Sequence, residues 1–121
     1  MPRILIVEDE PIIGMLLSEV LAGMGHEVCA VTTSENEAIA AAAQHLPDLM
    51  IVDAGLAEGS GLSAVDAILA TRFVPHLFTT GNALKVRRLK PSAVVLEKPF
   101  HENELAEAIA LVLSQTQELA A

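Results

Sequence analysis

Cysteine, basic residues and aromatic residues are all scarce in this sequence. The one cysteine, Cys29, excludes an intrachain disulfide. Its place in the apolar run 28–31 indicates a small buried residue rather than a reactive thiol. Seven basic residues stand against sixteen acidic ones, for a formal net charge of −9. Because an acidic surface repels the phosphate backbone, we expect no direct nucleic acid binding.

Long apolar runs, internal repeats and linker-like segments are also missing. The apolar stretches are short and broken by charge or proline, so the sequence predicts no membrane insertion. The start, Met1-Pro2-Arg3, leads straight into a strand-like run and lacks a signal peptide pattern, so we expect a cytoplasmic protein. With 121 residues, 52% of them hydrophobic, the chain fits one domain, residues 1–121, around one core.

Five short apolar runs alternate with helical stretches along the chain. The predicted strands are residues 3–7, 27–32, 48–53, 75–80 and 93–97. The first, third and fifth are nearly continuous in Ile, Leu, Val and Met, which is typical of parallel strands buried on both faces. The predicted helices are residues 11–22, a helix that opens at the 34–37 capping box and ends before residue 47, then 62–71, 84–89 and 102–113. This alternation predicts a three-layer α/β fold with a parallel sheet.

Acidic, hydroxyl and basic residues close these strands. They are Glu8 and Asp9 after the first, Asp53 at the end of the third, Thr80 at the end of the fourth and Lys98 after the fifth. Right-handed crossovers bring these strand ends to one edge of the sheet, where such folds bind ligands. Three acids placed together repel one another unless a cation is bound, and Mg²⁺ prefers carboxylate and phosphate oxygens. An aspartate beside Mg²⁺ and an ammonium group can act as a nucleophile and form an aspartyl phosphate.

Each of these residues also has a simpler interpretation when taken alone. Asp9 could cap the helix that begins at Pro11, and Lys98 could be an ordinary solvated side chain. The joint arrangement favours chemistry, because acids follow the first and third strands, a hydroxyl the fourth and Lys-Pro the fifth.

Four segments of the chain resemble the receiver domains of two-component response regulators. They are ILIVEDEP (4–11), DLMIVDAGLAEGSGL (48–62), HLFTTG (76–81) and VVLEKPF (94–100), and the resemblance covers nearly the whole chain. It implies a doubly wound, flavodoxin-like five-stranded sheet with strand order 2-1-3-4-5.

The same resemblance implies a role for each residue of the predicted site. Glu8, Asp9, Asp53 and the backbone carbonyl of Gly55 would bind Mg²⁺. Asp53 would accept the phosphoryl group, Lys98 would contact it, and Thr80 would be the switch hydroxyl. Thr80 is preferred to Thr79 because neighbouring strand residues point to opposite faces and Gly81 follows directly.

A receiver domain is a signalling switch rather than an enzyme with an external substrate. The resemblance implies that the chain catalyses only its own phosphorylation and dephosphorylation. The phosphoryl group would come from a histidine kinase or a histidine phosphotransfer protein. We expect output through a downstream protein partner or onward phosphoryl transfer. The run Phe78-Thr79-Thr80-Gly81 is also similar to the Phe-Ala-Thr-Gly signature of a subgroup of small single-domain regulators.

The sequence departs from the family pattern at several positions. Ala57 stands where proline is common, and Val95 replaces an aromatic switch residue in a chain without Tyr or Trp. The segment between Thr80 and Lys98 is short. Its basic run, made of Lys85, Arg87, Arg88 and Lys90, is either a solvated helix face or an output surface for an acidic partner.

Three other functions fit the pattern less well. A phosphatase with Asp53 as nucleophile usually has a second acid two positions on, where this chain has Gly55. A nucleotide- or flavin-binding module would need a glycine motif that Gly55, Gly59 and Gly61 do not form. A degenerate receiver that only binds partners would not need the intact set of acids, hydroxyl and lysine.

Overall fold

The computed structural model describes residues 1–120, with side chains as far as residue 116. A parallel five-stranded sheet runs through the centre in the order β2-β1-β3-β4-β5. The strands are β1 (Arg3–Val7), β2 (Glu27–Thr32), β3 (Leu49–Asp53), β4 (His76–Thr80) and β5 (Val94–Glu97). This confirms the flavodoxin-like strand order expected from the sequence.

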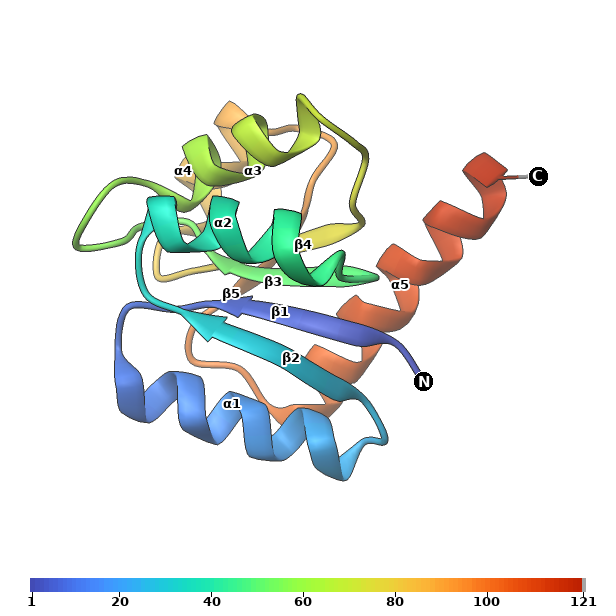
Figure 1. Cartoon of the computed structure of the whole chain (residues 1–121). Coiled ribbons are helices and arrows are strands. Elements are labelled where there is room, and N and C mark those ends of the chain that lie inside the picture. Colours follow the sequence, from blue (N-terminus) through green and yellow to red (C-terminus); the bar gives the residue numbers. More distant parts are fainter. Residues whose placement is uncertain (121) are drawn as a thin grey trace.

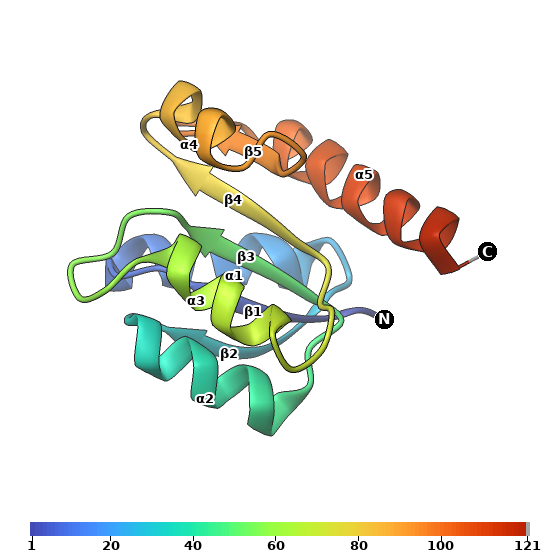
Figure 2. The same ribbon diagram turned by 90° about the horizontal axis from the view of Figure 1, so that it is seen from above.

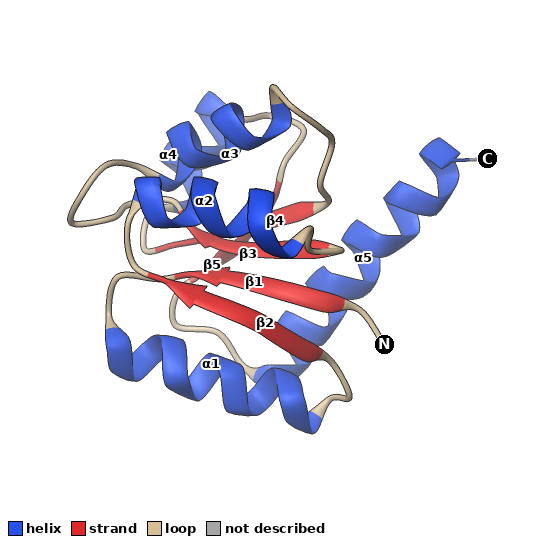
Figure 3. Ribbon diagram, viewed as in Figure 1, coloured by secondary structure: helices blue, strands red, loops and turns tan. Residues whose placement is uncertain are grey.

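Helices cover both faces of the sheet, as Figures 1 and 3 show. They are α1 (Pro11–Gly23), α2 (Glu35–His45), α3 (Gly61–Leu69), α4 (Ala83–Leu89) and α5 (Glu102–Ala120). One face packs on α1 and α5, and the other packs on α2, α3 and α4. Of the helices in the described part of the chain, none combines the length and the apolar character needed to cross a bilayer.

The central strands are buried on both faces, as their unbroken apolar sequences predict. In β1, Ile4 and Ile6 pack toward α1 and α5, whereas Leu5 and Val7 pack toward α2 and α3, and each is at most 1% exposed. Every residue of β3 is buried as well. Because two apolar layers hold β1 and β3, the residues that follow these strands have fixed positions.

Several element boundaries differ from the prediction. The last helix reaches Ala120 rather than residue 113, since no glycine or proline interrupts the sequence there. β3, β4 and β5 each begin one residue later than predicted, and α3 runs from Gly61 to Leu69 instead of 62–71. The short α4 has seven residues and ends at Leu89, two residues before Pro91, as predicted.

The predicted capping box at α2 forms only in part. The Ser34 side chain accepts a hydrogen bond from the Glu37 N–H at 3.2 Å, which is the expected cap. The Glu37 carboxylate does not return to Ser34; it accepts from the N–H and the hydroxyl of Thr33 at 3.0 and 3.1 Å. Of the two acids in this turn, Glu35 is the one that binds the segment between β3 and α3, as described below.

All five strands end at the same edge of the sheet. In Figure 1 the arrowheads of β1, β2 and β3 point to the left, toward the loop that joins β3 to α3, while the N-terminus lies at the opposite edge. Figure 2 shows α5 running past that opposite edge. The loop 54–60, called here the β3–α3 loop, is part of the edge where the predicted site residues meet.

Candidate functional site

Three carboxylates meet at the carboxyl edge of the sheet. Glu8, Asp9 and Asp53 each offer an oxygen, and these oxygens lie within 4.8 Å of one another. Glu8 is 3% exposed and Asp53 is 7% exposed, while Asp9 is half-buried. The sequence predicted this cluster, and β1 and β3 position it because they are adjacent and in register, with Val7 opposite Val52.

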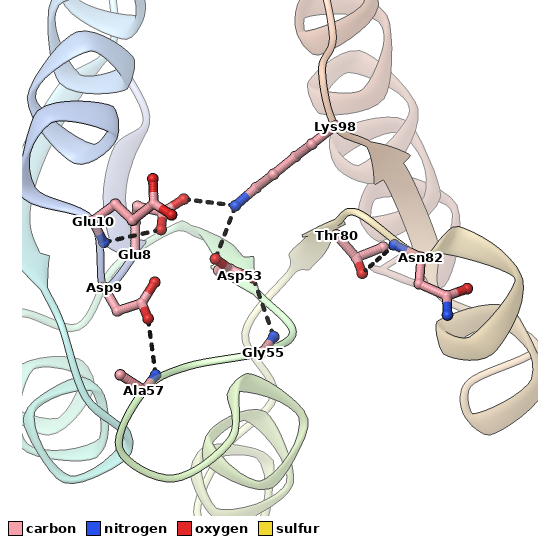
Figure 4. A network of polar contacts seen from close by, with 9 residues as sticks. All are labelled: Glu8, Asp9, Glu10, Asp53, Gly55, Ala57, Thr80, Asn82 and Lys98. Atoms are coloured by element: carbon pink, nitrogen blue, oxygen red, sulfur yellow. Dashed lines mark hydrogen bonds and ion pairs between the residues drawn. The ribbon is translucent and has the colours of Figure 1, made fainter.

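Lys98 supplies the positive charge of the cluster. Its ammonium group lies 2.9 Å from Glu8 Oε1 and 2.8 Å from Asp53 Oδ2, and it reaches them from the end of β5 (Figure 4). The bond to Asp53 agrees with the predicted location of Lys98. The bond to Glu8 was not predicted, because the sequence does not show that the Glu8 side chain turns into the sheet edge.

Burial and pairing shift the pKa values of two of these groups. Burial raises the pKa of Glu8, and it outweighs the hydrogen bond from Lys98, which favours the carboxylate. Burial alone would lower the pKa of Lys98, but the hydrogen bonds and charges of Asp53 and Glu8 together outweigh it and raise that pKa. Lys98 is thus a fully charged partner, while Glu8 is a carboxylate in an unfavourable environment.

Backbone N–H groups orient the other two carboxylates. Asp53 Oδ1 accepts from the Gly55 N–H at 3.1 Å, and Asp9 Oδ2 accepts from the Ala57 N–H at 2.8 Å (Figure 4). Asp9 is therefore not the cap of α1, whose first residue follows Glu10 without a side-chain cap. Both donors belong to the β3–α3 loop, so this loop sets the direction of two of the three acids.

A close approach of the backbone fixes the start of α3 against the end of β3. A Cβ at Gly61 would overlap the Asp53 carbonyl oxygen and come within 2.8 Å of Val52 Cγ1, so a larger residue cannot occupy this position without a shift. The Gly61 N–H donates to the Ala54 carbonyl at 3.1 Å. Gly61 thus serves tight packing behind Asp53 rather than a glycine-rich phosphate loop.

The structure places Thr80 at the same edge but outside the ion-paired network. Its hydroxyl accepts a hydrogen bond from the Asn82 N–H at 3.0 Å, beside the start of α4 (Figure 4). Thr79, the rejected alternative, is 3% exposed, and its carbonyl accepts from the Ala54 N–H. Gly55 is exposed, and the role of its carbonyl as a metal ligand stays a prediction.

The donor set of the cluster fits a hard divalent cation. All three candidate ligands are carboxylates, which suit Mg²⁺ or Ca²⁺ far better than a metal that prefers nitrogen or sulfur. The single charge of Lys98 balances only one of the two carboxylates it contacts. The pKa of Glu8 is raised by burial and by repulsion from Asp53. A cation among these oxygens would favour the charged form of Glu8 and reduce that repulsion.

Comparison with known proteins identifies the family of this chain. Residues 4–110 match the response regulator receiver domain. The chain is 38% identical over 116 residues to the phyllosphere-induced regulator PhyR of Methylorubrum extorquens, covering 92% of this chain and 43% of that protein. It is 33% identical over 123 residues to the transcriptional regulatory protein PdtaR of Mycobacterium tuberculosis, covering 98% of this chain and 60% of that one. The chain thus spans about half the length of these relatives.

A solved structure shows the same likeness in three dimensions. The receiver domain of the Erythrobacter litoralis PhyR response regulator superposes with a TM-score of 0.82 at 33% identity, covering 93% of this chain and 89% of that one. The family match over residues 4–110 and the likeness to this solved structure lead to the same conclusion: the chain belongs to the response regulator receiver domain family.

Proposed function

We propose that this chain is a phosphorylation switch in which Asp53 accepts a phosphoryl group in a Mg²⁺-dependent reaction. One observation carries the proposal: Asp53 lies at the carboxyl edge of the sheet between two further acids and the Lys98 ammonium. Its two oxygens have different partners, the Gly55 N–H on Oδ1 and Lys98 on Oδ2. The carboxylate is thereby held in one orientation for attack.

The phosphodonor would be a phosphohistidine of a histidine kinase or of a histidine phosphotransfer protein. An oxygen of Asp53 attacks phosphorus, the phosphorus–nitrogen bond breaks, and its electron pair stays on the imidazole, which takes a proton from water. Hydrolysis reverses the state, because water attacks phosphorus and the Asp53 carboxylate is released. In this proposal the chain catalyses only these two steps and is not an enzyme toward other substrates.

Each neighbour of Asp53 has a role in these steps. Glu8, Asp9 and Asp53, with the Gly55 carbonyl, would hold Mg²⁺, which would neutralise charge on the phosphoryl oxygens. Lys98 contacts Asp53 Oδ2, the oxygen that does not bind the Gly55 N–H. It can therefore also contact a phosphoryl group on Asp53 and balance its negative charge. The Thr80 hydroxyl, held by the Asn82 N–H, is the group that can turn toward a phosphoryl oxygen.

The output would be a protein–protein interaction in the cytoplasm. PhyR of Bartonella quintana is described as an anti-anti-sigma factor, and its solved structure is 28% identical to this chain with a TM-score of 0.85. A downstream protein partner of that general kind is part of our proposal for this chain. Direct nucleic acid binding is not, since the net charge is −9.

Phosphorylation by a small-molecule phosphodonor tests the proposal directly. We expect the intact chain with Mg²⁺ to gain one phosphoryl group by mass spectrometry, and we expect EDTA or Asp53→Asn to abolish the gain. Asp48→Asn is the matched control, because Asp48 precedes the same strand at the opposite edge of the sheet and accepts a hydrogen bond from the Arg3 N–H. Labelling of Asp53→Asn at the wild-type rate would contradict the proposal.

A further inference from the structure

The β3–α3 loop is held from two sides by carboxylates of other segments. Asp9 of the acidic cluster accepts from the Ala57 N–H at 2.8 Å. On the other side Glu35, the first residue of α2, accepts from the Ser60 N–H on Oε1 at 2.9 Å. The backbone N–H of Glu35 also donates to the Glu58 carbonyl at 3.3 Å. Glu35 therefore contacts the loop through both its side chain and its backbone.

The contact between Glu35 and the loop is close-packed. Gly59 has a φ of +84°, a conformation that residues with side chains rarely adopt. A Cβ at this position would lie 2.6 Å from Glu35 Cβ and 2.7 Å from Glu35 Oε1. Gly59 thus lets the loop backbone lie directly against Glu35, and the half-buried Glu35 side chain has little freedom to turn away.

Two further contacts connect Glu35 to the nucleophile. Ser60, which donates to Glu35, pairs across the loop with Gly55 in an isolated antiparallel bridge. The N–H of Gly55 then donates to Asp53 Oδ1 at 3.1 Å. Ser60 is thus paired with Gly55, and the Gly55 N–H orients Asp53.

We propose that Glu35 is a positioning residue for the acidic cluster. It anchors the β3–α3 loop so that the Gly55 and Ala57 N–H groups hold Asp53 and Asp9 in their metal-binding orientation. The inference rests on the proposed Mg²⁺-dependent function of this cluster. It adds to the cluster a supporting residue that lies at the start of α2 and not at a strand end. By linkage, a cation on the carboxylates should in turn stiffen the loop and its bond to Glu35.

Glu37 provides the matched control for Glu35. Both acids lie in the first turn of α2, where the negative charge of each interacts favourably with the helix dipole. Glu37 accepts hydrogen bonds from Thr33 and makes none to the loop. A variant at Glu37 therefore removes the same charge from the same turn without releasing the loop.

NMR titration of the full chain with Mg²⁺ tests the proposal. We expect Glu35→Ala to raise the Mg²⁺ Kd about 10-fold, the lower end of effects known for residues that orient metal ligands. Its Ser60 amide should exchange with solvent faster than in the wild type. Glu35→Gln keeps an acceptor oxygen and should stay within about twofold of the wild-type Kd, and so should Glu37→Ala.

Two outcomes would overturn the role of Glu35. One is an unchanged Mg²⁺ Kd in Glu35→Ala. The other is an equal loss of affinity in all three variants, which would show a general charge effect. A wild-type chain without any Mg²⁺-dependent shift would overturn the proposed function itself, so the two failures are distinguished by the wild-type titration.

Discussion

At the scale of single residues, Lys98 is the side chain whose contribution depends most on what occupies the site. Its ammonium group lies 2.9 Å from Glu8 and 2.8 Å from Asp53 and balances part of their charge. Loss of its charge would leave two largely buried carboxylates facing each other. Mg²⁺ would relieve the same repulsion, so the cation and the ammonium group partly replace each other.

We expect Lys98→Ala to lower the free energy of unfolding in EDTA by about 1.5–3 kcal/mol, the size of a hydrogen bond to a charged group. The loss should be smaller in excess Mg²⁺. Urea unfolding under the two conditions measures both values. Lys85→Ala is the control, because Lys85 is exposed and lies on α4 away from the acids. An equal loss with and without Mg²⁺ would contradict this account.

Cys29 allows a pH-dependent prediction at one residue. Its Sγ donates to the Ile4 carbonyl at 3.4 Å, and burial raises the pKa of the thiol. Since the thiolate is the reactive form, labelling by a disulfide reagent at pH 8 should be at least about tenfold slower in the folded than in the unfolded chain. Absorbance of the released thiolate measures the rate, and no second cysteine contributes.

The sign of the linked stability follows from the raised pKa of Cys29. The neutral thiol is favoured in the folded state, so this contribution is fully present below the unfolded-state pKa. It is lost as the pH rises through the higher folded-state pKa. Cys29→Ala should therefore lose less stability than the wild type between neutral and strongly alkaline pH. Equal alkaline losses would show that this thiol does not titrate as described.

At the same scale, the sequence predicted well which residues lie together at the site. It predicted their hydrogen-bond partners less well. Glu8, Asp9, Asp53 and Lys98 could be located because each follows an apolar strand. The role of Glu35 could not, since its partner Ser60 lies 25 positions away and the acid has an ordinary local explanation in the α2 capping box. Outside local motifs such as the Ser34 cap, bonds to backbone N–H groups of distant segments leave no signature in residue type.

At the scale of elements, α4 is connected to the site by a short series of hydrogen bonds. Thr80 accepts from the Asn82 N–H at 3.0 Å, and the Asn82 side chain caps α4 by accepting from the Lys85 N–H at 3.2 Å. The other end of α4 is tied to α3 by the ion pair between Lys90 and Asp66 at 2.7 Å. A turn of the Thr80 hydroxyl would therefore act first on the start of α4.

Loading with beryllofluoride, a phosphoryl analogue, should shift the NMR signals of residues 82–86 as well as those of Asp53. The reason is that the Thr80 hydroxyl must leave or share its bond with Asn82 to reach the analogue. Thr80→Val should keep the shift at Asp53 and reduce the α4 shifts by more than about half. Thr79→Val is the matched control, because its side chain points to the other face of β4. Loss of the α4 shifts in Thr79→Val alone would reverse this assignment.

The basic run 85–90 has fewer free charges for an acidic partner than its sequence indicates. Lys90 pairs with Asp66, and Arg87 donates to the Val95 carbonyl at 3.4 Å. Lys85 and Arg88 are exposed and make no ion pair among the side chains that the structure describes. Two of the four charges therefore have structural partners, which the residue spacing alone could not reveal.

At the scale of the whole molecule, the fold could be predicted from the sequence almost completely. The reason is that β1 and β3 are buried on both faces, and this leaves short but continuous apolar runs that are easy to recognise. The predicted end of α5 was wrong, because residues 114–120 contain no glycine or proline to mark where the helix stops. The start of β5 was off by one residue, because the Ala93 N–H donates to the Lys90 carbonyl in a local turn.

The stability of the whole molecule should respond to Mg²⁺, because a ligand that binds only the folded state stabilises it by mass action. The acidic cluster combines residues from two strands and exists only in the folded chain. At a free Mg²⁺ concentration 100 times its Kd, the free energy of unfolding should rise by about 2.7 kcal/mol. Urea unfolding in Mg²⁺ and in potassium chloride of equal ionic strength separates this gain from general screening of the net charge of −9.

Two variants show whether that gain comes from the cluster. Asp9→Asn keeps an acceptor for the Ala57 N–H but removes a ligand charge, so most of the Mg²⁺ gain should disappear while the loop contact survives. Glu58→Gln removes one charge from the exposed part of the same loop and should keep the gain. If both variants lost it equally, Mg²⁺ would be acting as a diffuse counterion to an acidic protein. A gain that persists in Asp9→Asn would place the cation outside the cluster of Glu8, Asp9 and Asp53.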